Sequence, residues 1–214
     1  MPYRPRTGTA GLVFHVLNRA VRRDRLFETA ADYLAFLKVI AQAQARIPLR
    51  ILAYCVMPNH FHLIAWPSRE GELSSFMHWF TATHSKRWHS HRRTAGTGSV
   101  YQGRFKAFPV QTDPHFLAVC RYVEQNALRA RLVSRAEDWE WSSLSDRCNN
   151  CDHIELAKWP IPQPENWLEL VNQVETTPVR DIRRSVMRSV AYGSEGWKKD
   201  LGCLFEEPKR HPRS

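Results

Sequence analysis

The spacing of apolar residues divides the first 133 residues into four strands and three helices. Short runs rich in β-branched and aromatic side chains, bounded by turn-forming residues, are typical of strands. These runs span residues 12–17, 50–57, 60–66 and 104–111. Apolar residues at intervals of three and four predict amphipathic helices, and these span residues 29–46, 73–91 and 114–133. The order is therefore β-α-β-β-α-β, followed by one further helix.

Prolines mark the ends of several of these elements. Pro58-Asn59 is a turn signal that joins the second and third strands as a hairpin. Asp113 is a favourable N-cap for the last helix, and Pro114 a favourable first residue. Pro109 indicates that the fourth strand lies at a sheet edge or carries a bulge, because proline cannot donate a ladder hydrogen bond.

This order of elements predicts an α+β protein with a ferredoxin-like βαββαβ core. In that arrangement an antiparallel sheet carries helices on one face, and the other face is available for a ligand or another element. The added helix at 114–133 has an apolar stripe suited to packing on a core. The stripe consists of Phe116, Cys120, Val123 and Ala127.

The pattern weakens after residue 133, and we divide the chain into a domain of residues 1–145 and a C-terminal segment of residues 146–214. We expect three tryptophans to pack this segment onto the domain, namely Trp139, Trp141 and Trp159. Short helices are predicted at 167–174, 178–190 and 194–202. From residue 178 onward, nine Lys and Arg residues face five acids. This basic helical tail fits a second nucleic-acid contact or a solvated surface equally well.

Composition adds the broad class. Hydrophobic residues make up 43% of the 214, which is typical of a globular protein. We expect no membrane span, because no apolar run reaches 18 residues, and no signal peptide. A cytoplasmic, nucleoid-associated protein is the expectation. The five cysteines are irregularly spaced and predict no disulfide framework. Cys148-x-x-Cys151 near His153 invites a zinc site, but a second cluster is missing, so reduced thiols are favoured.

Charge points to a polyanionic partner. The formal net charge is +10, and its distribution is more informative than its size. Residues 73–112 contain no Asp or Glu, although a solvated face usually mixes both signs. Phosphate groups close to this acid-free stretch explain it better than a merely basic surface does, so we expect a nucleic acid.

Two short patterns carry candidate chemistry. Side chains two apart on a strand point the same way, so His60 and His62 project from one sheet face, close enough to share a metal ion. Tyr122 and Asn126 are four apart on a helix and therefore also share a face. Each pattern has an ordinary alternative. The histidines fit surface or core positions, and Tyr122 fits a packing residue at the edge of the helix.

Several motifs together resemble a known family. His60-Phe-His62 is followed by Tyr101-Gln102-Gly103-Arg104-Phe105. Next come Tyr122-Val-Glu-Gln-Asn126-Ala-Leu-Arg129 and Trp139-Glu-Trp141-Ser-Ser143. In this order they resemble the single-tyrosine HUH transposases, and most of all the REP-associated tyrosine transposases. The resemblance covers residues 11–143 and implies a ferredoxin-like fold, in agreement with the element order.

The resemblance also implies a reaction. Tyr122, on the added helix, would be the catalytic nucleophile, while His60, His62 and Asn126 hold Mg²⁺ or Mn²⁺. Some relatives use glutamine at the last position, and Gln125 is adjacent, but Asn126 shares the face of Tyr122. A phenol has a pKa near 10, so a metal-polarised phosphate makes its attack feasible. The product would be a 5′-phosphotyrosine with a free 3′-hydroxyl, able to rejoin DNA without ATP.

The implied substrate is single-stranded DNA that folds into imperfect hairpins, similar to repetitive extragenic palindromes. Expected phosphate contacts are Lys86, Arg87, Arg104 and Lys106. Tyr101 and Trp88 are candidates for stacking on unpaired bases, although core packing is an alternative for Trp88. Candidate residues for reading the sequence are Arg19, Arg22, Arg23 and Gln102, and Arg129 completes the expected DNA contacts.

Two other functions compete with this one. Ferredoxin-like sheets also occur in proteins that bind single-stranded nucleic acids without cutting them. A metal-dependent nucleotide hydrolase is a third reading, but no acidic residue lies near the histidine strand before Glu70. Both a monomer and a homodimer are compatible with the sequence.

Overall fold

The fold is built on one four-stranded antiparallel sheet. In the computed structural model, residues 10–173, 177–188 and 190–202 are described. The strand order is β2-β3-β1-β4, and every neighbouring pair is antiparallel. The strands are β1 (Val13–Arg19), β2 (Arg50–Met57), β3 (His60–Trp66) and β4 (Lys106–Val110). The predicted ferredoxin-like fold is confirmed, and β4 with Pro109 is an edge strand as expected.

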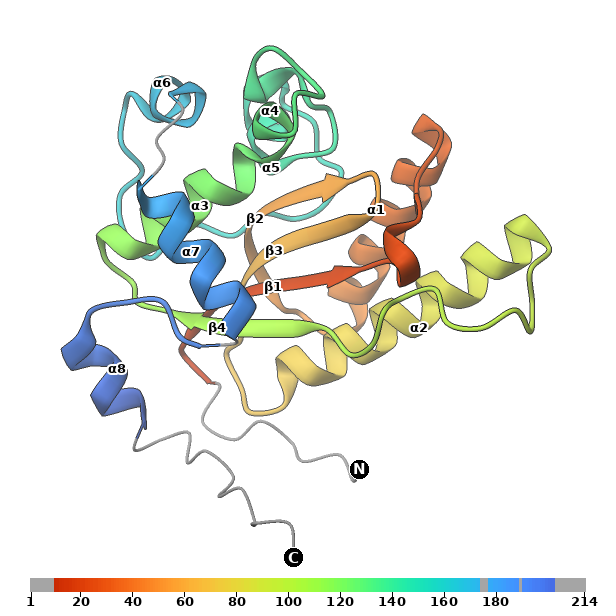
Figure 1. Cartoon of the computed structure of the whole chain (residues 1–214), viewed down its shortest axis with the longest axis horizontal. Coiled ribbons are helices and arrows are strands. Elements are labelled where there is room, and N and C mark those ends of the chain that lie inside the picture. Colours follow the sequence, from red (N-terminus) through yellow and green to blue (C-terminus); the bar gives the residue numbers. More distant parts are fainter. Residues whose placement is uncertain (1–9, 174–176, 189, 203–214) are drawn as a thin grey trace, which may run out of the picture.

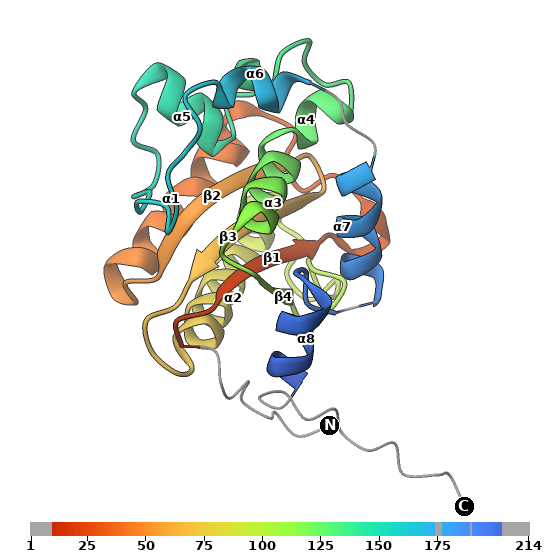
Figure 2. The same cartoon turned by 90° about the vertical axis from the view of Figure 1, so that its left-hand side faces the viewer.

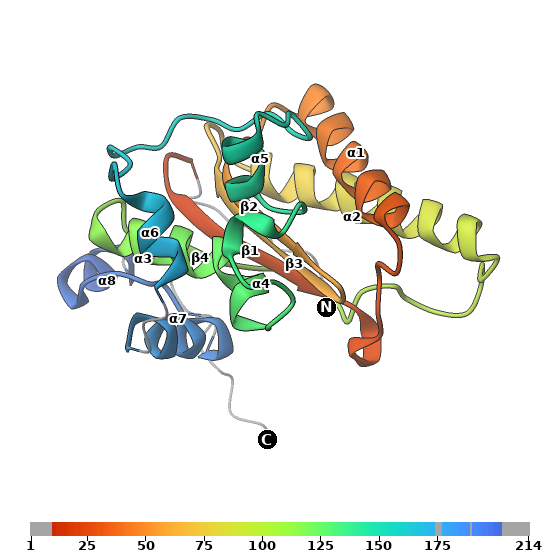
Figure 3. The same cartoon turned by 90° about the horizontal axis from the view of Figure 1, so that it is seen from above.

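One face of the sheet is covered by two helices, α1 (Ala30–Arg46) and α2 (Glu72–Arg92), which run side by side in Figures 1 and 3. Thr29 caps α1 through a capping box with Asp32, which satisfies two otherwise unpaired backbone N–H groups. Phe61 and Leu63 of β3 are fully buried in this layer. Their side chains therefore point away from the neighbouring histidines, as strand alternation requires.

The second face carries the added helix, but that helix is shorter than expected. A single helix to residue 133 is wrong: α3 (Pro114–Glu124) ends at Gln125, and a short α4 (Asn126–Arg129) follows. Both side-chain N–H groups of Gln125 donate to carbonyl groups of a later segment. The apolar stripe is nevertheless fully buried, as predicted: Phe116, Cys120, Val123 and Ala127.

The C-terminal segment packs onto the same second face, as Figures 2 and 3 show. Its helices are α5 (Ser143–Asn149), α6 (Trp167–Asn172), α7 (Thr177–Arg188) and α8 (Glu195–Gly202). Two 3-10 turns lie earlier in the chain, at Val21–Arg23 between β1 and α1 and at Ala136–Asp138 before α5. Val171 and Ile182 are buried in one cluster with α3. Val174, the last residue of the predicted helix 167–174, and the tail beyond Gly202 lie outside the described residues.

All three tryptophans predicted to fasten this segment bond directly to the sheet, two of them through their indoles. The indole of Trp159 donates to the carbonyl of Leu52, and that of Trp139 donates to Val56. The Trp141 ring stacks on Tyr33 of α1, and its backbone carbonyl accepts from the Val56 N–H of β2. Among the described residues, no helix combines the length and apolar character that a membrane crossing requires.

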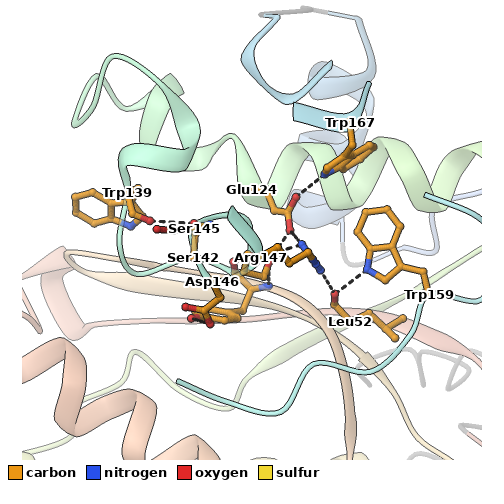
Figure 4. Close-up of polar contacts among 11 residues, drawn as sticks. Leu52, Glu124, Trp139, Ser142, Ser145, Asp146, Arg147, Trp159 and Trp167 are labelled. Carbon is orange, nitrogen blue, oxygen red and sulfur yellow. Dashed lines mark hydrogen bonds and ion pairs between the residues drawn. The ribbon is translucent and has the colours of Figure 1, made fainter. Parts of the chain in front are cut away.

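A buried carboxylate joins α3 to its surroundings (Figure 4). Glu124, at the end of α3, is completely buried. It accepts hydrogen bonds from the Ser143 hydroxyl at 2.5 Å, from the Trp167 indole at 2.7 Å and from the Arg147 guanidinium. Arg147 also donates to the Leu52 carbonyl of β2 at 2.6 Å. Helices α5 and α6 and strand β2 are thereby tied to the helix that carries Tyr122.

Removing this carboxylate should destabilise the whole protein. Glu124→Ala leaves the partly buried Arg147 guanidinium and the Trp167 indole N–H without their acceptor, which should cost about 3 kcal/mol, the lower end of the range for breaking a buried ion pair. Urea unfolding followed by circular dichroism measures this loss. Glu195→Ala is the matched control, because its bond to Lys198 lies on the surface and should leave the unfolding midpoint unchanged. Similar midpoints for both variants would contradict this role of Glu124.

Candidate active site

The two predicted histidines project from the second face of the sheet, beneath α3. His60 pairs with Arg19 and His62 with Leu17 across the β1–β3 ladder. Their ring centroids are 5.0 Å apart. His62 is buried and His60 is partly exposed. The hairpin turn and the alternation of β3 thus bring both imidazoles to one place, as the His-x-His spacing predicts.

One nitrogen of each imidazole is held by a neighbour. His60 Nδ1 lies 2.6 Å from Asn59 Oδ1, and His62 Nδ1 lies 2.8 Å from Nε2 of His15. Within the described residues, Nε2 of both predicted ligands makes no hydrogen bond. Metal-binding histidines are usually oriented in this way, through the nitrogen that does not face the metal.

His15 is a site residue that the sequence reasoning missed. It lies on β1, is 2% exposed, and stacks on His62 with ring centroids 5.0 Å apart. When its Nε2 accepts the Nδ1 proton of His62, the Nε2 lone pair of His62 is free. The signal was present in the alternation of the first predicted strand, which places His15 on the same face as Leu17. Without the strand pairing, however, the facing residue was unknown.

Burial keeps these rings neutral. It lowers the pKa of His15 to about 3 and, with the charge of Arg19, the pKa of His60 to about 4. The pKa of His62 lies well below its ordinary value of 6.5, first because of burial and then because of neighbouring positive groups. Only a neutral imidazole has a lone pair for a metal ion, so the site favours the ligand form.

Tyr122 reaches the histidines from α3. Its ring centroid lies 5.9 Å from those of His62 and His15, in edge contacts. The side chain is 7% exposed. The guanidinium carbon of Arg129 lies 4.5 Å from the centre of the same ring. The fold therefore places the phenol and the imidazoles together, although they are 60 positions apart in the chain.

The break in the helix separates the roles of two adjacent amides. Gln125 donates to the carbonyl groups of Val171 and Gln173 at 2.7 Å each, so its side chain is turned towards α6. Asn126 is 8% exposed and donates to the Val123 carbonyl at 3.2 Å. Its Oδ1 stays available as a ligand atom. Asn126 therefore suits a metal site better than Gln125 does.

The predicted DNA contacts lie in three places. Arg19, Lys106 and Arg129 lie around the histidine face. Arg19 pairs with His60 and Lys106 pairs with Leu17, and Arg129 lies over the Tyr122 ring. Arg22, Arg23 and Gln102 are exposed near the turn before His60, where Asn59 donates to the Arg23 carbonyl. The remaining three are exposed on the side of the sheet that α1 and α2 cover. Lys86 and Arg87 lie on α2, and Arg104 lies in the segment between α2 and β4.

The expectation that Tyr101 stacks on a base is wrong, because its ring is buried in the core. It is 6% exposed, contacts Phe61, and shares a 2.7 Å hydrogen bond between its hydroxyl and Nδ1 of His84. Trp88 is also packed: its indole donates to the Leu26 carbonyl, and Arg92 covers its ring. For Trp88, the packing alternative describes the structure.

The zinc alternative finds no support. Cys148 and Cys151 are exposed free thiols, and His153 bonds to Asp146 instead. Across the described ranges, no group of three or more His, Cys, Asp or Glu side chains could hold a metal ion. A metal at His60 and His62 therefore requires a ligand of another type, such as the Asn126 amide.

The neutral histidines should make stability depend on pH. The unfolded chain binds protons at these rings below pH 6.5, whereas folded His15 does so only near pH 3. Its contribution is thus complete above pH 6.5 and is lost as the pH falls towards 3. His15→Phe should reduce the pH slope of the unfolding free energy by about 1.4 kcal/mol per pH unit between pH 6 and 4. Urea unfolding across this range measures the slope, and equal slopes would contradict the neutral state of His15.

Known proteins identify the family. The family model described as "Transposase IS200 like" matches residues 9–126, more than half of the chain. A solved "Structure of the REP associates tyrosine transposase bound to a REP hairpin" is similar, with a TM-score of 0.53 and 20% identity. The match covers 77% of this chain and 99% of that one, and at this identity it shows the shared fold. No curated protein matches. The chain belongs to the IS200-like transposase family and is a DNA-processing transposase.

Proposed function

We propose that the protein cuts and rejoins single-stranded DNA at hairpin-forming repeats through a covalent bond to Tyr122. The observation that carries this proposal is the contact between the Tyr122 ring and His62 of the neutral imidazole pair. A similar solved transposase is bound to a REP hairpin. We therefore infer a substrate of the same kind, similar to repetitive extragenic palindromes.

The covalent step exchanges a bond between phosphorus and the DNA 3′ oxygen for a bond between phosphorus and Tyr122. The phenol of Tyr122 gives its proton to solvent, and its oxygen forms a bond to phosphorus while the bond to the 3′ oxygen breaks. The departing oxygen gains a proton and becomes a 3′-hydroxyl. Because the phosphodiester energy stays in the phosphotyrosine, another 3′-hydroxyl can reverse the step and join strands. The guanidinium of Arg129 lies over the same ring, 4.5 Å from its centre.

The same residues fit a divalent cation. His60 and His62 would hold it through Nε2, and the Asn126 amide through Oδ1. When bound, Mg²⁺ or Mn²⁺ would polarise a phosphate oxygen and offset charge in the transition state. Asn59 and His15 orient the two imidazoles, so their rings need little rearrangement. Imidazole and amide ligands suit Mn²⁺ by affinity, whereas cellular supply favours Mg²⁺.

Basic residues on the site side provide a path for the DNA strand. Arg22 and Arg23 are exposed and adjoin the turn before His60. Lys106 lies on the histidine face of β4. Contacts of this kind release counterions when a phosphate binds, so we expect affinity to fall as salt rises. Because one chain supplies the phenol and both imidazoles, a monomer can form a complete site.

Incubation with single-stranded hairpin DNA and Mn²⁺ should give an SDS-resistant protein–DNA adduct. Tyr122→Phe should abolish it, because no other oxygen occupies that position. His60→Ala with His62→Ala should reduce its rate by about two orders of magnitude or more. Tyr192→Phe is the matched control, since that tyrosine is partly buried beside His115 at the start of α3, and it should keep the adduct. An adduct that persists in Tyr122→Phe would exclude Tyr122 as the nucleophile.

Metal binding should depend on DNA. The proposed ligands are all uncharged, and Arg19 and Arg129 stand close enough to lower the pKa of His62, after the larger effect of burial. The protein thus offers a divalent ion no negatively charged ligand, and we expect the substrate phosphate to supply one. We expect Mn²⁺ to bind Tyr122→Phe protein at least about tenfold more tightly with hairpin DNA than without it. Titration followed by electron paramagnetic resonance measures this ratio. His60→Ala with His62→Ala should remove the difference, and equal affinities in Tyr122→Phe would refute it.

A further inference from the structure

Two arginines beside the candidate site have buried nitrogens that lack a partner. Nε of Arg19 and Nη1 of Arg129 are both covered from solvent and, within the part of the chain that is described, make no hydrogen bond. Neither arginine forms an ion pair with a described carboxylate. Other partly buried arginines of the protein do, for example Arg147 with Glu124 and Arg92 with Asp32.

Such nitrogens are costly. A buried donor without an acceptor loses its water and gains nothing, at about 1–3 kcal/mol and more for a charged group. Nearly all buried polar atoms in folded proteins have a partner. Two unpaired guanidinium nitrogens on one face of the sheet therefore indicate that an acceptor arrives from outside the chain.

Local packing does not account for them. The Tyr122 ring covers one side of the Arg129 guanidinium, and Nη1 still lacks a hydrogen-bond partner among the described residues. Among the described residues, the charged neighbour of Arg129 is another arginine, Arg183 of α7, and not a carboxylate that could accept its hydrogen bonds. Arg19 closes the other side of the site, at the end of β1 opposite His60. Arg129 lies over the Tyr122 ring, which contacts His62, and Arg19 pairs with His60, so the two arginines flank the histidine pair from different elements.

We propose that Arg19 and Arg129 together hold the phosphodiester that Tyr122 attacks, by donating from these unpaired nitrogens to its non-bridging oxygens. The inference rests on the proposed function, because it takes Tyr122 as the nucleophile. Guanidinium groups bind phosphate through charge-assisted hydrogen bonds. Negative charge on those oxygens grows during the attack, so fixed donors stabilise the transition state more than the bound strand. The arginines would bind the phosphate directly, while the histidine pair would hold the cation that polarises the same phosphate.

The test removes the charge of one phosphate. A hairpin ligand is selected from a randomised single-stranded library with the wild-type protein, and its cleaved linkage is located from the adduct. That linkage is then made either as phosphate or as neutral methylphosphonate. Affinities for both oligonucleotides are measured by fluorescence anisotropy in the Tyr122→Phe background, with and without Arg129→Gln.

We expect Arg129→Gln to weaken binding of the phosphate oligonucleotide about tenfold and to leave binding of the methylphosphonate oligonucleotide unchanged. The tenfold figure corresponds to one charge-assisted hydrogen bond at the lower end of its range. Arg87→Gln is the control, because Arg87 is exposed on α2. This substitution should reduce the affinity for both oligonucleotides by the same factor. Arg19→Gln tests the same coupling from the other side of the site and replaces Arg129→Gln if that variant does not fold.

The outcomes separate this inference from the proposed function. If the adduct forms but Arg129→Gln and Arg19→Gln each reduce the affinity for the two oligonucleotides equally, the proposed phosphate site is overturned and the proposed function stands. If the wild type gives no adduct, the function fails, and methylphosphonate is then placed at each linkage of the selected hairpin in turn. Coupling with Arg129 at one linkage would support the phosphate site, whereas coupling at none would overturn it.

Discussion

The position of α3 on the sheet is the constraint on which the candidate site depends. Histidines on β3 are fixed by the hairpin, but Tyr122 reaches them only if its helix stays on the same face. Apolar burial of the α3 stripe supplies most of the attraction. That attraction has little directional preference, so polar bonds must set the register of the helix. Glu124 and Gln125 provide those bonds to α5 and α6 at the end of the helix that carries Tyr122.

Much of the fold could be predicted from sequence because its signals are local. Strands β2 and β3 begin and end where the apolar runs and the Pro58-Asn59 turn place them. The end of α3 could not be predicted in this way. Residues 125–133 have helical periodicity, and the break depends on partners of Gln125 about 46 positions away. Helix α5 was missed for a similar reason, since its buried polar residues find partners on β2 and at Glu124.

The candidate site was predictable in part. His60 and His62 follow from strand alternation, and the resemblance supplied Tyr122 and Asn126. His15 needed the pairing of β1 with β3, which no local pattern gives. Tyr101 was misjudged because an aromatic residue in a basic stretch is equally compatible with stacking and with burial. Its hydrogen bond to His84 depends on the way α2 crosses the sheet, which periodicity does not reveal.

The partners of Glu124 bear on how the gene can change. The groups that donate hydrogen bonds to Glu124 belong to residues 143, 147 and 167. All three lie well beyond residue 126, where the family match ends. Arg147 and Trp167 of the C-terminal segment thus complete the buried contacts of the helix that carries Tyr122. A stop codon between residues 125 and 142 would leave the buried Glu124 carboxylate without any of these three partners. Copies of such a gene that decay from the 3′ end should therefore lose folding and catalysis together, and would not persist as shortened DNA-binding fragments.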